Sequence, residues 1–240
     1  MDMLARIAGA AAEAGDFERA EQITHTITDD PISSANALMW IAEAAAKAGD
    51  FERAEHIAHA MTDGYRQAKA LARVAGVVAE AGESGRATRL LDEAEHIART
   101  STERFESNRV NMLVWVAEAG AKAGESGRAA RILDDAERLA HTIDHTYSRA
   151  DALARVAETV AKSGDFDRAE RIAHTVTLDR SHRAKALVAL AQNSSSPRRK
   201  HVVADVLRLE NWQPSVDVLT ELAPATPEVI LTELTAVGLA

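Results

Sequence analysis

The 240-residue chain contains no cysteine, only five prolines and only 4% aromatic residues. The lack of cysteine excludes disulfide bonds and thiol chemistry, and it fits a reducing cytosol. No stretch approaches the ~18 consecutive apolar residues that indicate a membrane helix. Residues 1–16 show neither the basic start nor the apolar centre of a signal peptide. We therefore expect a cytoplasmic protein, and its high alanine content allows helices to approach closely.

The charge of the chain argues against two classes of partner. Lys and Arg together number 28 against 37 Asp and Glu, which gives a net charge of −9 and a pI of about 5.5. A sequence-independent grip on nucleic-acid phosphates needs a basic surface, and so does binding to an anionic membrane. We expect neither a nucleic acid nor a membrane as partner. Runs of alternating β-branched and aromatic residues are also absent, which predicts an all-α fold.

Five copies of one short motif show that the chain is internally repeated. The string Gly-Asp-Phe-Glu-Arg-Ala occurs at Gly15–Ala20 and Gly49–Ala54, and Gly164–Ala169 has Asp in place of Glu. Looser copies, Gly-Glu-Ser-Gly-Arg-Ala, occur at Gly82–Ala87 and Gly124–Ala129, so the spacings are 34, 33, 42 and 40 residues. Repeats of this length must stack on one another to bury their apolar faces. Such an array acts through an extended binding surface.

The period of the apolar residues predicts two helices in each repeat, which we term A and B. The glycine of the motif ends helix A, and Asp16, Asp50 and Asp165 cap the helix B that follows. The predicted helices cover 2–14 and 17–28, 33–48 and 51–61, 64–81 and 84–100, 103–123 and 126–141, and 147–163 and 166–177.

The third and fourth repeats carry seven extra residues in helix B, at Thr88–Ala94 and Ala130–Ala136. Seven residues are almost two helical turns, so the apolar stripe keeps its phase while the helix lengthens by about 10 Å. The longer helices either form a ridge that meets a partner or record a neutral duplication.

After residue 177 the repeat signal weakens. Helices are predicted at Arg183–Ala191, Arg198–Leu209, Trp212–Leu222 and Val229–Val237. Because an array needs an atypical last repeat to cover the open end of its core, we assign residues 178–240 to divergent repeats and C-terminal capping helices. Residues 1–177 then form five helix-pair repeats, and the two parts make one continuous domain.

The motif is similar to the turn and the start of helix B in the tetratricopeptide repeat. That family places a small residue, a polar turn, an aromatic residue and an alanine at the same offsets. The resemblance extends over about residues 1–177 and more weakly over 178–240. It implies a right-handed α-solenoid of about seven antiparallel helix pairs, whose A helices line a concave groove that holds an extended peptide or a partner helix.

The chain also departs from the family in two respects. Leu, Ala and Ile replace the aromatics that the family has early in helix A and late in helix B, so the chain resembles the Ala/Arg-rich bacterial arrays common in actinobacteria. Some members of the family hold peptide C-termini with a carboxylate clamp of Lys, Asn and Arg. Lys69 and Arg73 match part of that clamp, whereas Ala5, Gly9 and Trp40 occupy its other positions. A standard carboxylate clamp is not expected.

One helix A position forms a ladder of large side chains through the repeats: Arg6, Trp40, Arg73, Trp115 and Arg155. The residue three places on, which lies on the same helix face, is Gly or Glu in every repeat. Tryptophan and arginine lead among binding hot spots, and arginine can stack on tryptophan or hold a carboxylate. We predict that this ladder, with Lys69, lines the groove and binds a peptide with acidic and apolar side chains. The alternative is that each Trp is core and each Arg pairs with a neighbouring Glu.

The nine histidines do not predict a metal site. One repeat position near the end of helix B holds Arg99 in the third repeat and histidine in the others, at His25, His59, His141 and His174. A position that accepts arginine suits a solvated cation near a helix C-terminus. Equivalent residues of adjacent repeats also lie on the order of 10 Å apart, too far to share a metal ion. We expect neither a metal nor any other cofactor.

Catalytic motifs are also missing from the sequence. It contains no nucleophile elbow, no dinucleotide-binding glycine pattern, no phosphate loop and no zinc-protease helix, so we expect no catalytic residues and no enzymatic activity. The sequence favours a protein–protein interaction scaffold that binds a partner protein or peptide segment in its concave groove. Two alternatives stay open: a ligand-sensing regulatory array, and a helical-repeat enzyme such as a DNA-glycosylase-like protein.

Overall fold

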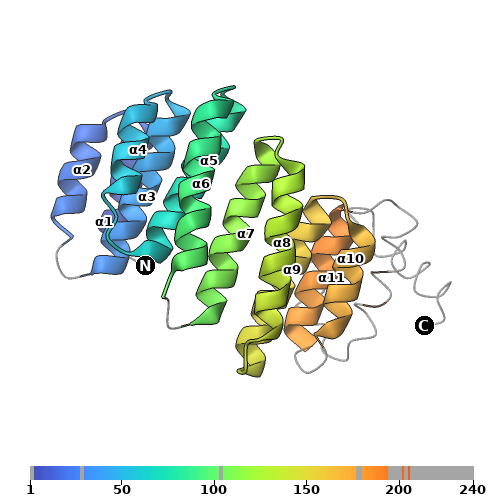
Figure 1. Ribbon diagram of the computed structural model, residues 1–240. Helices are drawn as coiled ribbons and strands as arrows, with labels where there is room; N and C mark the ends of the chain where they lie inside the picture. The colour runs from blue at the N-terminus through green and yellow to red at the C-terminus, as the bar shows by residue number, and fades with distance from the viewer. Residues whose placement is uncertain are drawn as a thin grey trace, which may run out of the picture. The chain divides into compact units, whose positions relative to one another are not determined.

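The computed structural model describes residues 3–27, 30–102, 105–176 and 180–193, together with Val202 and Asp205. Over these residues the chain forms eleven α helices and no β strand, so the predicted all-α class is confirmed (Figure 1). The helices are α1 (Met3–Glu13), α2 (Phe17–His25), α3 (Pro31–Lys47), α4 (Phe51–His59), α5 (Gly64–Glu80), α6 (Ser84–Thr100), α7 (Glu106–Lys122), α8 (Ser126–His141), α9 (Thr146–Lys162), α10 (Phe166–Thr175) and α11 (Arg180–Asn193).

All ten helices predicted for the five repeats are present, with ends that differ by up to three residues. Helix α3 begins two residues early because the carboxylate of Asp30 accepts hydrogen bonds from the backbone N–H groups of Ile32 and Ser33. Pro31, which has no N–H to satisfy, suits the first helical position. Helix α11 extends the predicted segment by three residues at its start and two at its end. The helices predicted at 212–222 and 229–237 lie outside the described residues, and so does the helix predicted at 198–209 apart from Val202 and Asp205, which are both helical.

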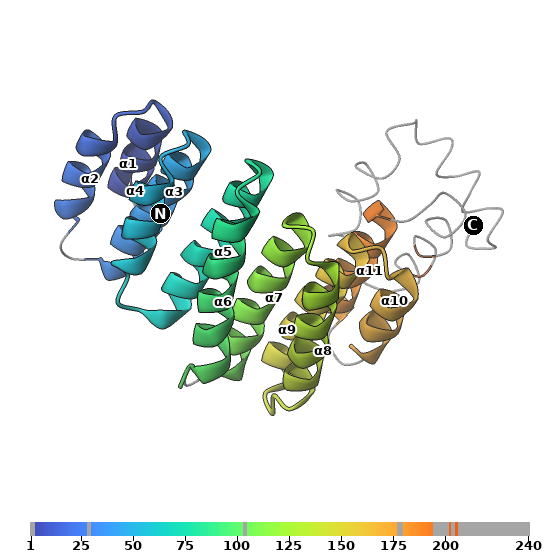
Figure 2. The same ribbon diagram turned by 45° about the horizontal axis from the view of Figure 1, so that its top comes forward.

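The chain divides into two compact units, residues 1–136 and residues 137–240, and the boundary falls inside α8. In the N-terminal unit, the A helices α1, α3, α5 and α7 pack side by side in chain order. Helices α2, α4 and α6 each pack against their own A helix and against the next one, which gives the row of helix pairs in Figures 1 and 2. In the C-terminal unit, α9, α10 and α11 pack against one another. None of the described helices is both long and apolar enough to cross a membrane.

The turn between helix A and helix B has the same geometry in all five repeats. Its glycine adopts a left-handed conformation, with φ between 78° at Gly124 and 91° at Gly164. In the first repeat the N–H of Gly15 donates to the carbonyl of Ala12, and the N–H of Asp16 donates to the carbonyl of Ala11, both at 2.9 Å. This is the Schellman pattern of a helix C-terminus. The same two hydrogen bonds recur in the other four repeats.

The residue after this glycine begins the next helix. The side chains of Asp16, Asp50 and Asp165 accept a hydrogen bond from the backbone N–H three residues on, as their N-cap role predicts. The third repeat has Glu83 at this place, and its longer side chain makes no cap hydrogen bond. Two consecutive residues therefore end one helix and start the next.

Small side chains fill most of the contacts between helices. Alanine is the most frequent buried residue, and Ala8, Ala42, Ala75 and Ala117 are at most 1% exposed. The larger buried side chains are Ile, Leu, Val and Met, such as Ile41 and Met112. The helices can therefore approach closely without aromatic side chains between them.

Two glycines of the fourth repeat provide a matched test of the turn. Replacing Gly124 by alanine should destabilise the fold by about 1 kcal/mol, because its φ of 78° is unfavourable for a residue with a Cβ. Gly127→Ala should be neutral or stabilising by up to about 1 kcal/mol, because Gly127 is helical and nothing lies within 4 Å of an added Cβ. Urea unfolding of the two variants measures both effects. Equal stability changes would contradict the role of the left-handed glycine.

Candidate functional site

The ladder position of the N-terminal unit lies on one face of the A helices, which we call the A-helix face. Trp40 on α3 packs over the backbone of α1, since a Cβ added to Gly9 would lie 3.2 Å from Cε3 of Trp40. Trp40 also contacts the small cluster formed by Ala5, Ala8, Ile27 and Ala37. The buried part of this tryptophan therefore contributes to the contact between the first and second repeats.

On the same A-helix face, an ion pair joins the second and third repeats. Arg73 on α5 contacts Glu43 on α3 through Nη2 and Oε2 at 2.5 Å, and Lys47 contacts the other oxygen of Glu43 at 2.8 Å. Burial alone would raise the pKa of Glu43, but the hydrogen bond from Lys47 and the charge of Arg73 outweigh it and lower the pKa below its ordinary value. Trp40 thus contacts Gly9, and Arg73 contacts Glu43. Gly9 and Glu43 occupy the same helix A position, three residues after the ladder residue of the preceding repeat.

Between the third and fourth repeats, the A-helix face carries two aromatic rings and a cation. The rings of Trp115 on α7 and Tyr65 on α5 lie 5.0 Å apart at 59°, and Nζ of Lys69 lies 4.8 Å from the centre of the Trp115 ring. All three side chains are half-buried, so each keeps part of its surface open to solvent. An aromatic plane next to an ammonium group can receive a ligand that is apolar at one point and acidic at another.

The two remaining ladder residues lie apart from these contacts. Arg6 is exposed on α1, and it makes no ion pair with any residue in the described part of the chain. Arg155 belongs to the C-terminal unit, where its Nε donates to Asp151 at 3.1 Å on the same helix. Asp151 also lies 3.6 Å from Nε2 of His182, whose ring meets Tyr147 edge to face. The predicted site thus comprises one face of the N-terminal unit and one residue of the C-terminal unit.

The arginine of the repeated motif has a role that the sequence analysis missed. In each repeat after the first, this arginine reaches back to helix B of the preceding repeat. Arg53 lies over the ring of Phe17 at 5.1 Å, and Arg86 lies over the ring of Phe51 at 5.5 Å. Arg86 also forms an ion pair of 3.1 Å with Glu55, without hydrogen-bond geometry at that oxygen.

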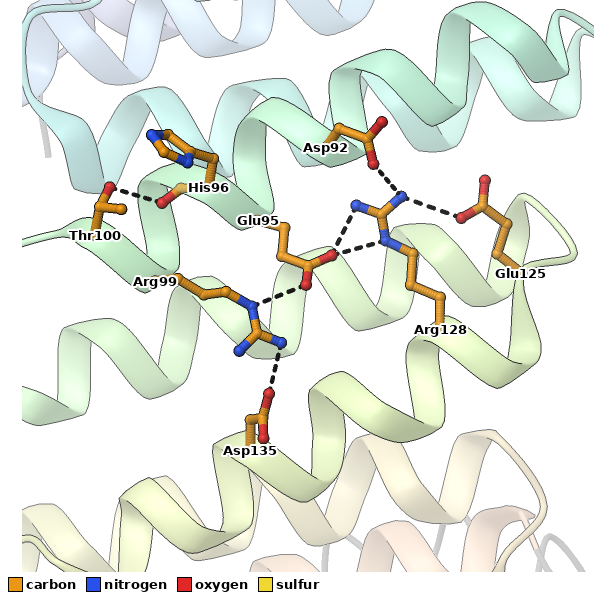
Figure 3. Close-up of polar contacts among 8 residues, drawn as sticks. All are labelled: Asp92, Glu95, His96, Arg99, Thr100, Glu125, Arg128 and Asp135. Atoms are coloured by element: carbon orange, nitrogen blue, oxygen red, sulfur yellow. Dashed lines mark hydrogen bonds and ion pairs between the residues drawn. The ribbon is translucent and has the colours of Figure 1, made fainter.

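In the fourth repeat the motif arginine is at the centre of an ionic network (Figure 3). Arg128 on α8 donates to Glu95 on α6 through Nε at 2.9 Å and Nη2 at 2.7 Å, and Nη1 contacts Asp92 at 2.8 Å and Glu125 at 3.2 Å. Its side chain is only 11% exposed. Three carboxylates therefore hold one nearly buried guanidinium between two repeats.

Glu95 connects this arginine to a second one. Its other oxygen accepts a hydrogen bond from Arg99 at 2.9 Å, and Arg99 continues to Asp135 on α8 (Figure 3). Burial raises the pKa of Glu95, but hydrogen bonds from Arg99 and Arg128 outweigh burial and hold the pKa below its ordinary value. The network therefore keeps Glu95 ionised at neutral pH.

The pairing of the motif arginine with a B-helix glutamate continues in the C-terminal unit. Arg168 on α10 donates to Glu137 at 2.9 and 2.7 Å, and Glu137 occupies the same repeat position as Glu55 and Glu95. The signal for this link was present in the sequence, because both the arginine and the glutamate recur at fixed places in the repeat.

A second link uses the repeat position that holds mostly histidine. His59 contacts Glu93 of the next repeat through Nε2 at 2.6 Å, and Arg99, its counterpart one repeat later, contacts Asp135. Glu93 and Asp135 occupy equivalent places in the long B helices, and Asp92, Glu93 and Asp135 all lie within the seven-residue insertions. The insertions therefore supply acidic partners for the neighbouring repeats: Glu93 and Asp135 for the preceding repeat, and Asp92 for the following one.

One side-chain cluster of the C-terminal unit has metal-ligating residues but unfavourable geometry. Ligand atoms of Glu170, His174 and Asp205 lie within 4.8 Å of one another, beside an open cavity of about 650 Å³. Nη2 of Arg183 lies 2.6 Å from Nδ1 of His174 and donates to it, so the proton of a neutral His174 sits on Nε2, which faces the two carboxylates. That nitrogen then has no lone pair for a metal ion.

No protein-family model matches the chain, and no curated protein matches it. Among solved structures, the chain is similar to the crystal structure of Ton1535 from Thermococcus onnurineus NA1, with a TM-score of 0.57 and 18% sequence identity. The alignment covers 99% of this chain and 83% of that chain. At this identity the similarity concerns the fold alone.

The Arg128 network can be tested by comparing two arginines of α8. Arg128→Ala should lower the free energy of unfolding by about 2 kcal/mol, because it leaves carboxylates between two repeats without their cation. Arg131→Ala, at an exposed arginine without an ion pair in the described part of the chain, should change it by less than about 0.5 kcal/mol. Chemical denaturation measures the difference, and similar losses in the two variants would show that the network contributes nothing.

The His59–Glu93 pair predicts a pH-dependent contribution to stability. The hydrogen bond to Glu93 raises the pKa of His59 above its ordinary value of 6.5, against a smaller opposing effect of burial, and Nδ1 meets the backbone carbonyl of Glu55 at 2.7 Å. Both ring nitrogens therefore face acceptors, which favours the imidazolium. Because the folded pKa is raised, the stabilisation is complete below about pH 6.5 and is lost as the pH rises through the folded pKa.

His59→Ala should therefore reduce the free energy of unfolding at pH 5.5 by about 0.5 kcal/mol, the order expected for an exposed pair, and by less at pH 9. Thermal or urea unfolding at the two pH values measures this. His25→Ala is the matched control, since His25 holds the same repeat position, is exposed and has no charged partner in the described part of the chain. A pH-independent loss in His59→Ala would contradict the assignment.

Proposed function

We propose that the protein is a protein–protein interaction scaffold of the tetratricopeptide-like α-solenoid type, and that it binds a partner segment along its A-helix face. The cluster of Trp115, Tyr65 and Lys69 is the observation that carries the proposal. These side chains come from two repeats and remain partly open to solvent. Tryptophan and tyrosine are among the residue types that lead in binding hot spots, and Lys69 adds a cation beside the Trp115 ring.

The chemistry of the A-helix face favours an extended peptide with apolar and acidic side chains. An apolar side chain can cover the open part of the Trp115 ring while an acidic one approaches Lys69. Arg73 offers a second cation, because its side chain is 40% exposed and Glu43 occupies only one side of its guanidinium. Arg6 adds an exposed cation on α1. Trp40 then supports the face from beneath, through its contact with Gly9.

Several features support the finer description of the fold as a solenoid. The five identical left-handed turns and the side-by-side A helices of the N-terminal unit are the local geometry of a stacked helical repeat. About seven helix pairs, a right-handed superhelix with a concave groove, a bacterial source and a cytoplasmic location complete the proposal. In that description Arg155 holds the ladder position of the fifth repeat.

The proposal predicts that Trp115→Ala weakens peptide binding without loss of helicity. Peptides are selected from a random phage-displayed library on the wild-type protein, and their affinities are measured by fluorescence anisotropy. We expect Trp115→Ala to weaken binding by about 2 kcal/mol, or roughly 30-fold, and Arg73→Ala to act similarly while making binding less sensitive to salt. Circular dichroism reports helicity in each variant.

Phe105→Ala is the matched control, because Phe105 is a 59% exposed aromatic residue at the start of the same helix. It should leave the affinity unchanged. If Trp115→Ala instead unfolds the protein by the ~3–5 kcal/mol typical of a lost core aromatic, the ladder serves packing and the binding site lies elsewhere. Selected peptides that bind Trp115→Ala as tightly as the wild type would also reject the proposed site.

A further inference from the structure

Two contacts between A helices carry the same six residue types on the A-helix face. Helices α1 and α5 hold Arg, Gly and Glu at three places, and helices α3 and α7 hold Trp, Glu and Lys at the equivalent places. Helix α1 packs against α3 in the first contact, and α5 packs against α7 in the second contact. The first set is Arg6, Gly9, Glu13, Trp40, Glu43 and Lys47, and the second set is Arg73, Gly76, Glu80, Trp115, Glu118 and Lys122.

In the first contact the tryptophan covers the glycine. A Cβ added to Gly9 would lie 3.2 Å from Cε3 of Trp40 and 3.6 Å from two more of its atoms. Glycine therefore allows the ring to lie closer to the backbone of α1 than a residue with a Cβ would. Lys47 pairs with Glu43 on its own helix at 2.8 Å. In this arrangement the ring is packed on the neighbouring helix.

In the second contact a lysine covers the glycine instead. Cδ of Lys122 would lie 3.4 Å from a Cβ added to Gly76, and Nζ of Lys122 continues to Glu80 on α5 at 3.1 Å. No atom of Trp115 would lie within 4 Å of that Cβ, and its ring lies against the ring of Tyr65. The same six residue types thus adopt two different side-chain arrangements.

The side chains that surround each tryptophan account for the difference. Trp40 packs against a cluster to which the first repeat contributes small and aliphatic residues: Ala5, Ala8 and Ile27. Around Trp115 the third repeat contributes the ring of Tyr65, tilted by 59°, and Nζ of Lys69, 4.8 Å from the ring centre. The aromatic pair and the cation–π contact both stabilise the ring away from Gly76, and part of the ring stays open to solvent.

We infer that the ring of Trp115 has two positions, and that three positioning residues decide between them: Gly76, Lys122 and Tyr65. In the outward position the ring lies on Tyr65, as described above, and is open to a partner. In the inward position the ring lies over Gly76, in the same way that Trp40 lies over Gly9.

The inward position requires Lys122 to leave the space over Gly76, because that space holds either the lysine or the ring. Lys122 then pairs with Glu118, which precedes it by four residues on the same helix, as the lysine does in the first contact. An inward ring is packed on α5 and offers less surface to a partner, so the apparent affinity falls with the fraction of inward molecules. This consequence rests on the proposed function, whereas the two positions do not.

Fluorine NMR of the full chain labelled with 5-fluorotryptophan tests the two positions without any partner. Trp115→Phe identifies the Trp115 resonance among those of the three tryptophans. Lys122→Ala should move this resonance, because it empties the space over Gly76, and Tyr65→Ala should move it in the same direction. Gly76→Ala in the Lys122→Ala background should return it to the wild-type position, because the new Cβ blocks the inward ring. A merely structural loss of the Lys122–Glu80 ion pair would not be reversed in this way.

Three further variants serve as controls. Gly76→Ala alone should leave the resonance in place, because the added Cβ meets the flexible side chain of Lys122 at 3.4 Å. Gly85→Ala adds a Cβ to another helical glycine with nothing within 4 Å, and Lys162→Ala removes the lysine of the same repeat position in the fifth repeat. Neither should move the Trp115 resonance. Circular dichroism checks that each variant keeps its helices.

The same variants connect the ring position to partner binding. For a peptide selected on the wild type, Lys122→Ala should weaken binding several-fold, and the double variant with Gly76→Ala should restore the affinity. A Trp115 resonance that stays in place in Lys122→Ala overturns the two positions, and so does a shift that Gly76→Ala does not reverse. Resonances that behave as expected while the affinity stays constant overturn the control of binding by Trp115. If no peptide binds the wild type, the proposed function fails and the control of binding fails with it, whereas the fluorine spectra decide the two positions by themselves.

Discussion

The fold depends on one backbone constraint, the left-handed glycine at the turn of each repeat. Without it, helix A would continue or end at an uncontrolled angle, and its last carbonyl groups would lose their hydrogen bonds. The next residue is already the N-cap of helix B, so the turn leaves almost no freedom between the two helices. Every other contact described above assumes this hairpin geometry. The close alanine packing, the A-helix face and the ionic links all require that helix A and helix B meet at the same distance in each repeat.

Two kinds of contact join one repeat to the next: the packing of small alanine side chains, and the contacts of a few large or charged side chains. Alanine is the most frequent buried residue, but small identical side chains would tolerate a shifted register. The ion pairs of Arg128 and Arg168 are directional, because a guanidinium must meet its carboxylates at defined distances. On the A-helix face, Trp40 over Gly9 and Arg73 on Glu43 fix the register from the other side. Register is thus specified by a few large or charged residues on an otherwise small-residue surface.

The sequence predicted the helices and their caps well because those depend on local chemistry. The turn glycines, Asp16 and Pro31 each end or start a helix through hydrogen bonds or backbone geometry within one helical turn. The period of the apolar residues predicts where the helices lie between these ends. The ionic links escaped prediction because the partners lie 31 to 36 residues apart, from Arg168–Glu137 to Arg99–Asp135. Sequence pattern shows that both members of a pair recur, but not that they touch. For the same reason the pattern could identify the ladder of Arg and Trp without showing that Trp40 lies on Gly9 while Trp115 meets Tyr65 and Lys69.

The recurrence of the arginine–glutamate link has a consequence for how such a chain can change in length. Since the motif arginine and the B-helix glutamate occupy fixed places, the arginine of any repeat is compatible with the glutamate of any other. Removing the whole third repeat would bring Arg128 to face Glu55 in place of Glu95, and the link would be preserved. Unequal recombination between copies of the gene segment could therefore add or delete whole repeats without creating a mismatched junction. Loss of half a repeat would not preserve the link, because it would remove either the arginine or the glutamate and leave the other side chain without its partner.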